Sequence, residues 1–397
     1  MFNKKWFLLI VLVLIMLNIF GWGIYFSYLL LPYCFNYIIQ KKGKYDLGFI
    51  SIALFSVFYT IMVSVNVNMF YPAASIFVGY LFLPPAFYIA GQILIDKLER
   101  SNQLYRILLL SAFFLSLIPF ISNVNDVINY GFMKRLNVTL PWNAEENITS
   151  ATLIAGYLSL NISIIPILFI SGLNWDEKRY KIYSLFLILM GLFSIINMAR
   201  RTSLVIIIIT LTLFTLLVKN KKATWFYLVV FFTILIYVYS VNKWNVRTFF
   251  EDSIFFKRIT GAIDVRGDTR INIWSAAINH IWKNPFGNYE VFSTKIGYAH
   301  NLWLDVAGKA GIIPVLFLLL HTFYNIFNSA KVILNKAYPD LLRFILLGFS
   351  TAFLVTFFVE PVMEGLFNLF CVFCLFSGMI KQIRGSNKFD VNTVPIG

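Results

Sequence analysis

GYAHNLWLDVAGKAGIIP, residues 297–314, is the stretch where the chain passes from a polar loop into a long apolar helix. The chain has 3 histidines, and His300 is the only one that stands at such a junction. Water, a lipid-borne molecule and a fixed helix end can all meet there. We therefore expect His300 to be the chemical centre of the protein and the rest of the chain to be mostly scaffold.

The composition of the whole chain is that of a membrane protein. Of the 397 residues, 59% are apolar and only 13% are charged. Polar groups are therefore too few to cover a soluble globule of this size. Apolar runs near the length of a membrane-spanning helix recur from one end to the other. We predict an all-α, polytopic helix bundle that forms a single integral membrane domain over residues 1–397.

Twelve spanning helices are predicted from these runs. The first run, residues 6–39, is too long for one span, because about 34 helical residues cover roughly 50 Å against a hydrocarbon core of about 30 Å. We divide it into two spans at Gly21-Trp22-Gly23. The other ten spans are expected at residues 47–70, 73–95, 105–121, 150–173, 182–199, 202–218, 225–240, 302–328, 341–360 and 362–380.

The net charge of +15 comes mainly from short basic clusters between the apolar runs. Such clusters are typical of orientation signals, which gather on the cytoplasmic side, so we expect a membrane partner and no nucleic acid. With two spans in the first run and a cytoplasmic N-terminus, seven clusters face the cytoplasm. They are Lys4/Lys5, Lys41/Lys42/Lys44, Lys97/Arg100/Arg106, Lys178/Arg179/Lys181, Lys219/Lys221/Lys222, Lys331/Lys336/Arg343 and Lys381/Arg384/Lys388.

The larger polar excursion, residues 241–300, is expected on the opposite face, with His300 at its end. Within it, residues 268–284 have apolar side chains at three- and four-residue spacing, a capping residue at the start and Pro285 after the end. This pattern predicts an amphipathic helix. We expect that helix to lie on the membrane surface or to pack over the mouth of the bundle.

Two arginines, Arg200 and Arg201, interrupt the apolar sequence NMARRTSLVIIII. A charge at membrane depth marks a substrate path when it faces the bundle interior, although a snorkelling pair at a helix end is the alternative. On the predicted topology this turn shares a face with Arg266, Arg270 and His300. Guanidinium groups bind phosphate with two hydrogen bonds, and imidazole titrates near neutral pH. The set predicts a site for an anionic, lipid-linked substrate.

Carboxylates near the same face leave their roles open. Glu360 and Glu364 can line an acceptor site or assist His300, or they can simply face water at their helix ends. Asp305 can make a local hydrogen bond or cap, or it can take part in catalysis. Neither outer loop contains an Asp-x-Asp pair, so no metal or other cofactor is expected.

The other two histidines are given structural roles. His321 lies deep in a predicted span and is expected to be a polar packing residue. His280 lies on the amphipathic helix and is expected at the surface.

Three patches together resemble the O-antigen ligase and Wzy-type O-antigen polymerase superfamily of bacterial envelope enzymes. They are ARRTSL at 199–204, TRINIWSAAINHIWKNPFGN at 269–288 and AHNLWLDVAGKAGIIP at 299–314. The patches lie in the order and at about the spacing found in that superfamily, whose members have twelve spans. They cover the C-terminal half of the chain.

The resemblance implies a metal-independent glycosyltransferase that acts on the periplasmic side of the bacterial inner membrane. Its substrate would be an oligosaccharide carried by undecaprenyl pyrophosphate, and a chain-length regulator protein would be a possible partner. His300 matches the essential histidine of the family. Arg201 and Arg270 match its arginines, and Arg200 and Arg266 are additional basic residues beside them.

Chemistry alone suggests roles for these groups. Transfer of a glycan from pyrophosphate to a hydroxyl needs a base near the attacking oxygen and positive charge on the leaving group. His300 would be that base or would orient the acceptor. We predict direct displacement with inversion at the anomeric carbon, since no carboxylate nucleophile is evident.

The leading interpretation is a polymerase of lipid-linked repeat units. A ligase that transfers polysaccharide to lipid A-core is the alternative within the family. A flippase of the same lipid-linked oligosaccharide is the alternative from another class. A transporter would place its polar residues along a path through the bilayer, whereas here they gather on one side.

Overall fold

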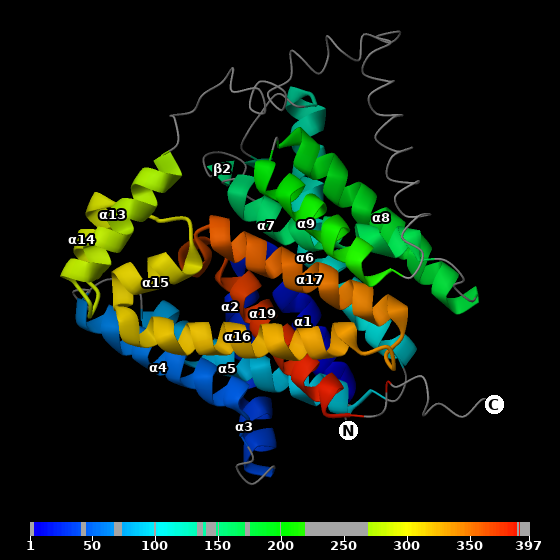
Figure 1. Cartoon of the computed structure of the whole chain (residues 1–397), viewed down its shortest axis with the longest axis horizontal. Coiled ribbons are helices and arrows are strands. Elements are labelled where there is room, and N and C mark those ends of the chain that lie inside the picture. Colours follow the sequence, from blue (N-terminus) through cyan, green and yellow to red (C-terminus); the bar gives the residue numbers. More distant parts are fainter. Residues whose placement is uncertain are drawn as a thin grey trace. The chain divides into compact units, whose positions relative to one another are not determined.

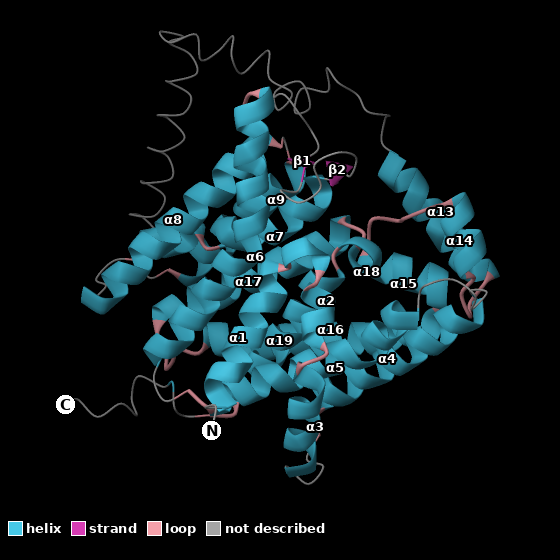
Figure 2. Cartoon of the chain, turned by 180° about the vertical axis from the view of Figure 1, so that it is seen from behind, coloured by secondary structure: helices cyan, strands magenta, loops and turns pink. Residues whose placement is uncertain are grey.

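The computed structural model describes residues 4–40, 45–66, 74–98, 101–132, 138–139, 148–149, 151–170, 175–198, 200–218, 269–386 and 389. The regular secondary structure of this part of the chain is helical except for two short antiparallel strands, β1 (Val138–Thr139) and β2 (Ile148–Thr149) (Figure 2). Seven of its helices are long and apolar enough to cross a membrane. The prediction of a helical, multi-pass membrane protein is confirmed at this level.

The seven helices match predicted spans. They are Leu47–Val65, Phe77–Asp96, Ser101–Tyr130, Lys178–Asn197, Ile312–Leu334, Asp340–Val359 and Phe367–Arg384. Shorter apolar helices at Phe7–Leu17, Ile154–Phe169 and Thr202–Leu217 fall in three further predicted spans. The span expected at 225–240 and residues 241–268 of the loop expected at 241–300 lie outside the described residues. The total of twelve spans and the periplasmic position of the loop therefore stay predictions.

The chain divides into two compact units. The first consists of residues 1–107, 268–339 and 356–397, and the second of residues 108–267 and 340–355. The boundaries fall within two helices, α6 (Ser101–Tyr130) and α17 (Asp340–Val359). Each unit is described by itself below.

The first unit contains most of the helices (Figure 1). They are α1 (Lys4–Leu17), η1 (Ile19–Gly21), α2 (Gly23–Ser27), α3 (Leu30–Gln40), α4 (Leu47–Asn66), α5 (Ala74–Asp96), α13 (Thr269–Lys283), α14 (Tyr289–Lys295), α15 (Leu302–Ala310), α16 (Ile312–Leu334), α18 (Val362–Gly365) and α19 (Phe367–Arg384). The break predicted in the first apolar run is present, since Asn18 and Phe20 adopt left-handed conformations there.

Close helix contact in the first unit depends on two glycines. Helix α5 packs against α19, and α16 packs against α4. A Cβ atom added to Gly91 of α5 would collide with the Leu375 carbonyl, and one added to Gly378 of α19 would collide with the Tyr88 carbonyl. Small residues allow helix backbones to approach in this way within membranes. The two glycines therefore bring α5 and α19 into backbone contact.

The second unit is a smaller helical bundle with polar groups in its interior. Besides parts of α6 and α17, it contains α7 (Ala151–Ser163), η2 (Ile165–Phe169), α8 (Trp175–Asn197) and α9 (Arg201–Leu217). The Asn197 Nδ2 group donates a 2.8 Å hydrogen bond to Asn123 Oδ1, and Asn161 Nδ2 donates one of 2.8 Å to Ser116 Oγ. These buried side-chain pairs link α6 to α8 and to α7.

The predicted start of the span at 302–328 is wrong. The chain forms two helices there, α15 and α16, with a break at Gly311, whose φ is +87°. The backbone of Phe286 occupies the place where a Cβ of residue 311 would lie, and Ile312 N–H donates a 2.9 Å hydrogen bond to the Pro285 carbonyl. The loop after α13 thus ends α15, and the membrane-spanning helix begins only at Ile312.

The helix predicted at 268–284 is confirmed as α13, but it has two apolar faces rather than one. One face packs on α15, and Ala277 forms a small buried cluster with Phe292 and Ala299. Three apolar side chains of α13 are exposed instead: Ile271, Ile278 and Trp282. Both views show α13 and α14 beside α15, at one end of α16 (Figures 1 and 2).

Candidate functional site

Helix α15 begins at a three-residue turn, Ala299–Asn301, and the last residue of this turn caps the helix. The Asn301 Oδ1 atom accepts hydrogen bonds of 3.1 Å from the backbone N–H groups of Trp303 and Leu304. Asparagine is a favoured N-cap residue because its side-chain oxygen satisfies N–H groups that lack partners in the first turn. The cap fixes the start of α15 directly after His300.

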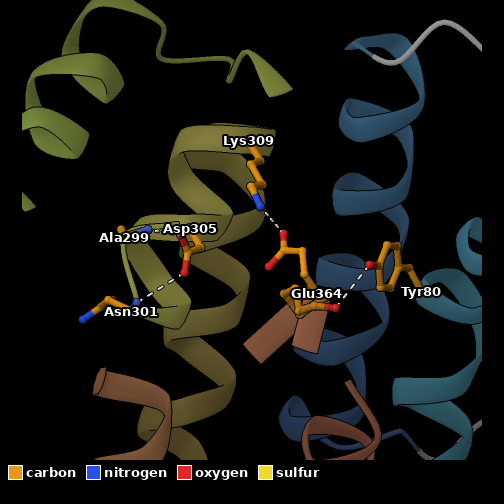
Figure 3. A network of polar contacts seen from close by, with 7 residues as sticks. Tyr80, Ala299, Asn301, Asp305, Lys309 and Glu364 are labelled. Atoms are coloured by element: carbon orange, nitrogen blue, oxygen red, sulfur yellow. Dashed lines mark hydrogen bonds and ion pairs between the residues drawn. The ribbon is translucent and has the colours of Figure 1, made fainter. Parts of the chain in front are cut away.

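The carboxylate of Asp305 stabilises the same turn by accepting hydrogen bonds from its backbone N–H groups. It accepts hydrogen bonds from Ala299 N–H at 2.6 Å and from Asn301 N–H at 3.3 Å (Figure 3). His300 lies between these two peptide groups, with φ at +54°. A left-handed conformation costs a residue with a side chain about 1–2 kcal/mol. The carboxylate therefore stabilises a backbone conformation that His300 adopts at a cost.

Two further segments of the first unit bind this turn. The Trp274 Nε1–H group of α13 donates a 2.8 Å hydrogen bond to the Ala299 carbonyl. The Asn301 Nδ2 group donates one of 3.2 Å to the Phe358 carbonyl, near the end of α17. The Trp274 and Phe358 rings also pack edge to face, with centroids 5.2 Å apart. The backbone on both sides of His300 is therefore fixed by three separate segments of the chain.

The His300 imidazole is half-buried and lies beside the Tyr298 ring, with centroids 6.4 Å apart. Among the described residues, its buried Nδ1 atom has no hydrogen-bond partner. Burial lowers the pKa of His300 below its usual 6.5, and the positive charge of Arg270 lowers it further. The imidazole is therefore neutral at pH 7 and able to accept a proton.

Arg270 is the predicted arginine that the structure brings to His300. It is the second residue of α13 and its side chain is exposed. After burial, its positive charge is the second cause that lowers the pKa of His300. An exposed guanidinium beside a neutral imidazole can bind an anion and leave the imidazole free to take up a proton.

Arg200 and Arg201 belong to the second unit, at the predicted turn between two apolar helices. Arg201 is the first residue of α9, and the partly buried Arg200 is its N-cap residue. Arg266 lies outside the described residues.

Behind the turn, Lys309 of α15 forms an ion pair with Glu364 of α18 (Figure 3). The side chains are 1% and 17% exposed, so water screens this pair poorly. The Lys309 Nζ atom also lies 4.8 Å from the centroid of the Tyr298 ring and 5.5 Å from that of Tyr289. Tyr298 thus contacts both the ion pair and His300.

The possibility that Glu360 and Glu364 simply face water is wrong. Glu360 is buried, and Glu364 is bound to Lys309. The Glu364 Oε2 atom is enclosed and has no hydrogen-bond partner among the described residues. The neighbouring Met363 carbonyl accepts a 3.2 Å hydrogen bond from the Tyr80 hydroxyl, which ties α18 to α5 (Figure 3).

Asp305 lies close enough to this pair for its charge to be affected. It is 1% exposed and belongs to α15, outside the seven long apolar helices. Burial, and then the negative charge of Glu364, raise its pKa to about 7, although the two N–H donors and Lys309 oppose the rise. Of the two roles left open for Asp305, the structure shows the local hydrogen bonds.

The other histidines differ from expectation in one case. His321 is fully buried, and its Nδ1–H donates a 3.0 Å hydrogen bond to the Gly48 carbonyl, so the predicted packing role is confirmed. His280 was expected at the surface and is instead 8% exposed, packed against the Phe292 ring. Its helix turns this side toward α14 and α15, which sequence spacing alone does not reveal.

Sequence reasoning missed Lys309 as part of the site. The signal available was a lysine inside the apolar run AGKAGII, where a charge needs a partner. That partner, Glu364, is far away in the sequence. Within the described part of the chain, no three or more His, Cys, Asp or Glu side chains are grouped as metal ligands would be.

Comparison with known proteins adds no family assignment. No family model matches the chain, and no curated protein matches it.

Proposed function

We propose that this protein is a glycosyltransferase that joins oligosaccharide repeat units carried by undecaprenyl pyrophosphate at the periplasmic face of the bacterial inner membrane. The observation that carries the proposal is a neutral imidazole, His300, held on a fixed turn beside an exposed guanidinium, Arg270. The turn precedes a membrane-spanning helix that begins at Ile312. A lipid-anchored anionic substrate could be bound at such a position.

In the proposed reaction, His300 accepts the proton of an acceptor sugar hydroxyl. The hydroxyl oxygen forms a bond to the anomeric carbon of the donor, and the bond from that carbon to the pyrophosphate oxygen breaks. The electron pair of the broken bond leaves with the pyrophosphate. Arg270 and Arg201 neutralise the charge that develops there, with Arg200 and Arg266 as further basic groups.

Direct displacement with inversion is supported by the state of two nearby carboxylates. Both oxygens of Asp305 accept backbone hydrogen bonds, and Glu364 is paired with Lys309. A carboxylate used in these ways is a poor nucleophile for a covalent glycosyl intermediate. A trapped glycosyl-enzyme would contradict this part of the proposal.

The test is a transfer assay with purified protein in detergent. The substrate is undecaprenyl-pyrophosphate-linked repeat units extracted from cells that lack this protein. The proposal predicts a ladder of longer lipid-linked glycans, with one undecaprenyl pyrophosphate released for each bond formed. A protein that makes no ladder, but transfers glycan once lipid A-core is added, would be a ligase.

A flippase would give a third result. In sealed vesicles it would move the lipid-linked repeat unit across the bilayer and form no new glycosidic bond. Translocation by wild-type protein without any ladder, with or without lipid A-core, would therefore replace the enzyme proposal with transport.

A further inference from the structure

The Asp305 carboxylate has no direct part in the proposed reaction, yet it is among the most enclosed charged groups near the site. It is 1% exposed, and its two oxygens bind the peptide N–H groups on either side of His300. These hydrogen bonds are made to the backbone, so the carboxylate acts on the imidazole through the conformation of the turn. Such a group can hold a catalytic residue in position.

The backbone of His300 needs this support. Its φ of +54° lies in a region that residues with a side chain rarely adopt. Loss of either hydrogen bond would let the turn relax toward an ordinary conformation and displace the imidazole. A misplacement of about 1 Å can lower a reaction rate on the order of 100-fold.

Several ionisable groups lie on the elements packed against α15. The charges of Glu364 of α18 and of Lys309 of α15 itself act on the pKa of Asp305. Those on α13, α14 and α4 are Arg270, His280, Lys283, Tyr289, Glu290, Lys295 and Tyr59. Helix α16 contributes Tyr324, Lys331 and His321, of which His321 binds Gly48.

We propose that Asp305 is a positioning residue for His300, and that the Lys309–Glu364 ion pair, which begins one turn further along α15, influences whether Asp305 is ionised. The proposal rests on the function proposed above. An ionised carboxylate offers an acceptor oxygen to each of the two peptide N–H groups. A protonated one carries an O–H group in place of one acceptor, so one of the two hydrogen bonds is weakened.

The direction of the pH effect follows from the pKa of Asp305, which is raised to about 7. Above that pH the carboxyl group is ionised and both hydrogen bonds are complete. As the pH falls through about 7, Asp305 takes up a proton and the turn loosens. This happens before His300 itself is protonated, because the pKa of His300 lies below 6.5.

The first test compares the pH dependence of transfer by wild type and by Asp305→Asn, with the extracted lipid-linked repeat units as substrate. In wild type, kcat should decline as the pH is lowered through about 7. Asp305→Asn has one acceptor oxygen at every pH. Its kcat should be on the order of 100-fold lower, with little change in KM, and its decline should move to below pH 6.5.

The second test changes the neighbour instead of the carboxylate. Glu364→Gln keeps an oxygen for Lys309 but removes the negative charge that raises the Asp305 pKa. The decline in kcat should therefore move to lower pH than in wild type. Asp305→Glu keeps a carboxylate and should recover part of the activity that Asp305→Asn loses.

The outcomes separate this inference from the proposed function. If His300→Ala transfers glycan as well as wild type, the proposed function fails. If His300→Ala is inactive but Asp305→Asn keeps the kcat and pH profile of wild type, only the positioning role fails. The apparent melting temperature identifies variants that do not fold. Should Asp305→Asn be among them, an unshifted profile in Glu364→Gln would by itself overturn the inference.

Discussion

The starts of α9 and α15 hold Arg201 and His300, two groups of the proposed reaction, and they are built in different ways. The α15 turn is held by a side-chain cap from Asn301 and by the Asp305 carboxylate. The α9 turn has Arg200 as its N-cap residue, with no side-chain hydrogen bond to the helix start. Its backbone is closed by a 3.2 Å hydrogen bond from Arg200 N–H to the Ile195 carbonyl.

The difference teaches what each turn has to do. A proton moves only between atoms within hydrogen-bonding distance, so a base must be held in place. A guanidinium stabilises a charge over several ångströms, and a long side chain can reach its target from a simpler turn. The more elaborate turn carries the imidazole, which fits the proposed proton transfer.

The largest effect is expected from a substitution that removes the imidazole and suits the left-handed backbone conformation of residue 300. His300→Gly relieves the strain of a φ of +54° and should not lower the melting temperature. The rate of transfer should fall by about 10²- to 10⁴-fold, because general base catalysis is lost. Added imidazole should restore part of the rate, and a variant with no loss would remove the distinction between the two turns.

Replacing the arginines should lower the rate less than removing the imidazole, and a conservative replacement should be tolerated better. Arg270→Ala and Arg201→Ala should each lower kcat by about 10²- to 10³-fold, as expected for a lost contact to the leaving group. Both variants should also weaken inhibition by inorganic pyrophosphate. Arg201→Lys keeps the charge and should retain more activity than Arg201→Ala, whereas equal losses would show that geometry matters as much at α9 as at α15.

The caps offer a direct comparison of stability. Asn301→Ala removes two hydrogen bonds from the start of α15 and a third to the Phe358 carbonyl, so it should cost at least about 1 kcal/mol. Arg200→Ala removes no side-chain cap from α9, so it should destabilise its helix start less than Asn301→Ala does. Thermal unfolding in detergent measures both, and a larger loss for Arg200→Ala would contradict the comparison.

The smallest effect concerns two tryptophans of α13. Trp274→Phe loses the hydrogen bond to the Ala299 carbonyl and should cost about 0.5–1.5 kcal/mol. Trp282 is 78% exposed, so Trp282→Phe is the matched control, with an expected change within about 0.5 kcal/mol in detergent. Equal melting temperatures for the two variants would mean that Trp274 does not support the turn.

Much of the fold could be predicted from sequence, because it follows from local apolar runs. The break near Gly21, the turn before Arg201 and the helix after Asp268 are all signalled by neighbouring residues. The break at Gly311 was missed, because it depends on the backbone of Phe286 packing against that glycine. A glycine in an apolar run does not by itself reveal such a contact.

The candidate site was predicted in part. His300 stands out by its place at a polar–apolar junction, and Arg270 does lie within reach of it electrostatically. The Lys309–Glu364 pair could not be found by pattern, since it joins residues from helices that are distant in the chain. The burial of His280 likewise depends on which side of α13 meets α15.

The central claim is that His300 accepts the proton when lipid-linked repeat units are joined. The most direct measurement is the rate of undecaprenyl pyrophosphate release at pH 8 by purified wild type and His300→Ala at equal protein concentration. The account predicts a rate about 10²- to 10⁴-fold lower for His300→Ala, with an unchanged melting temperature. Equal rates for the two proteins would contradict it.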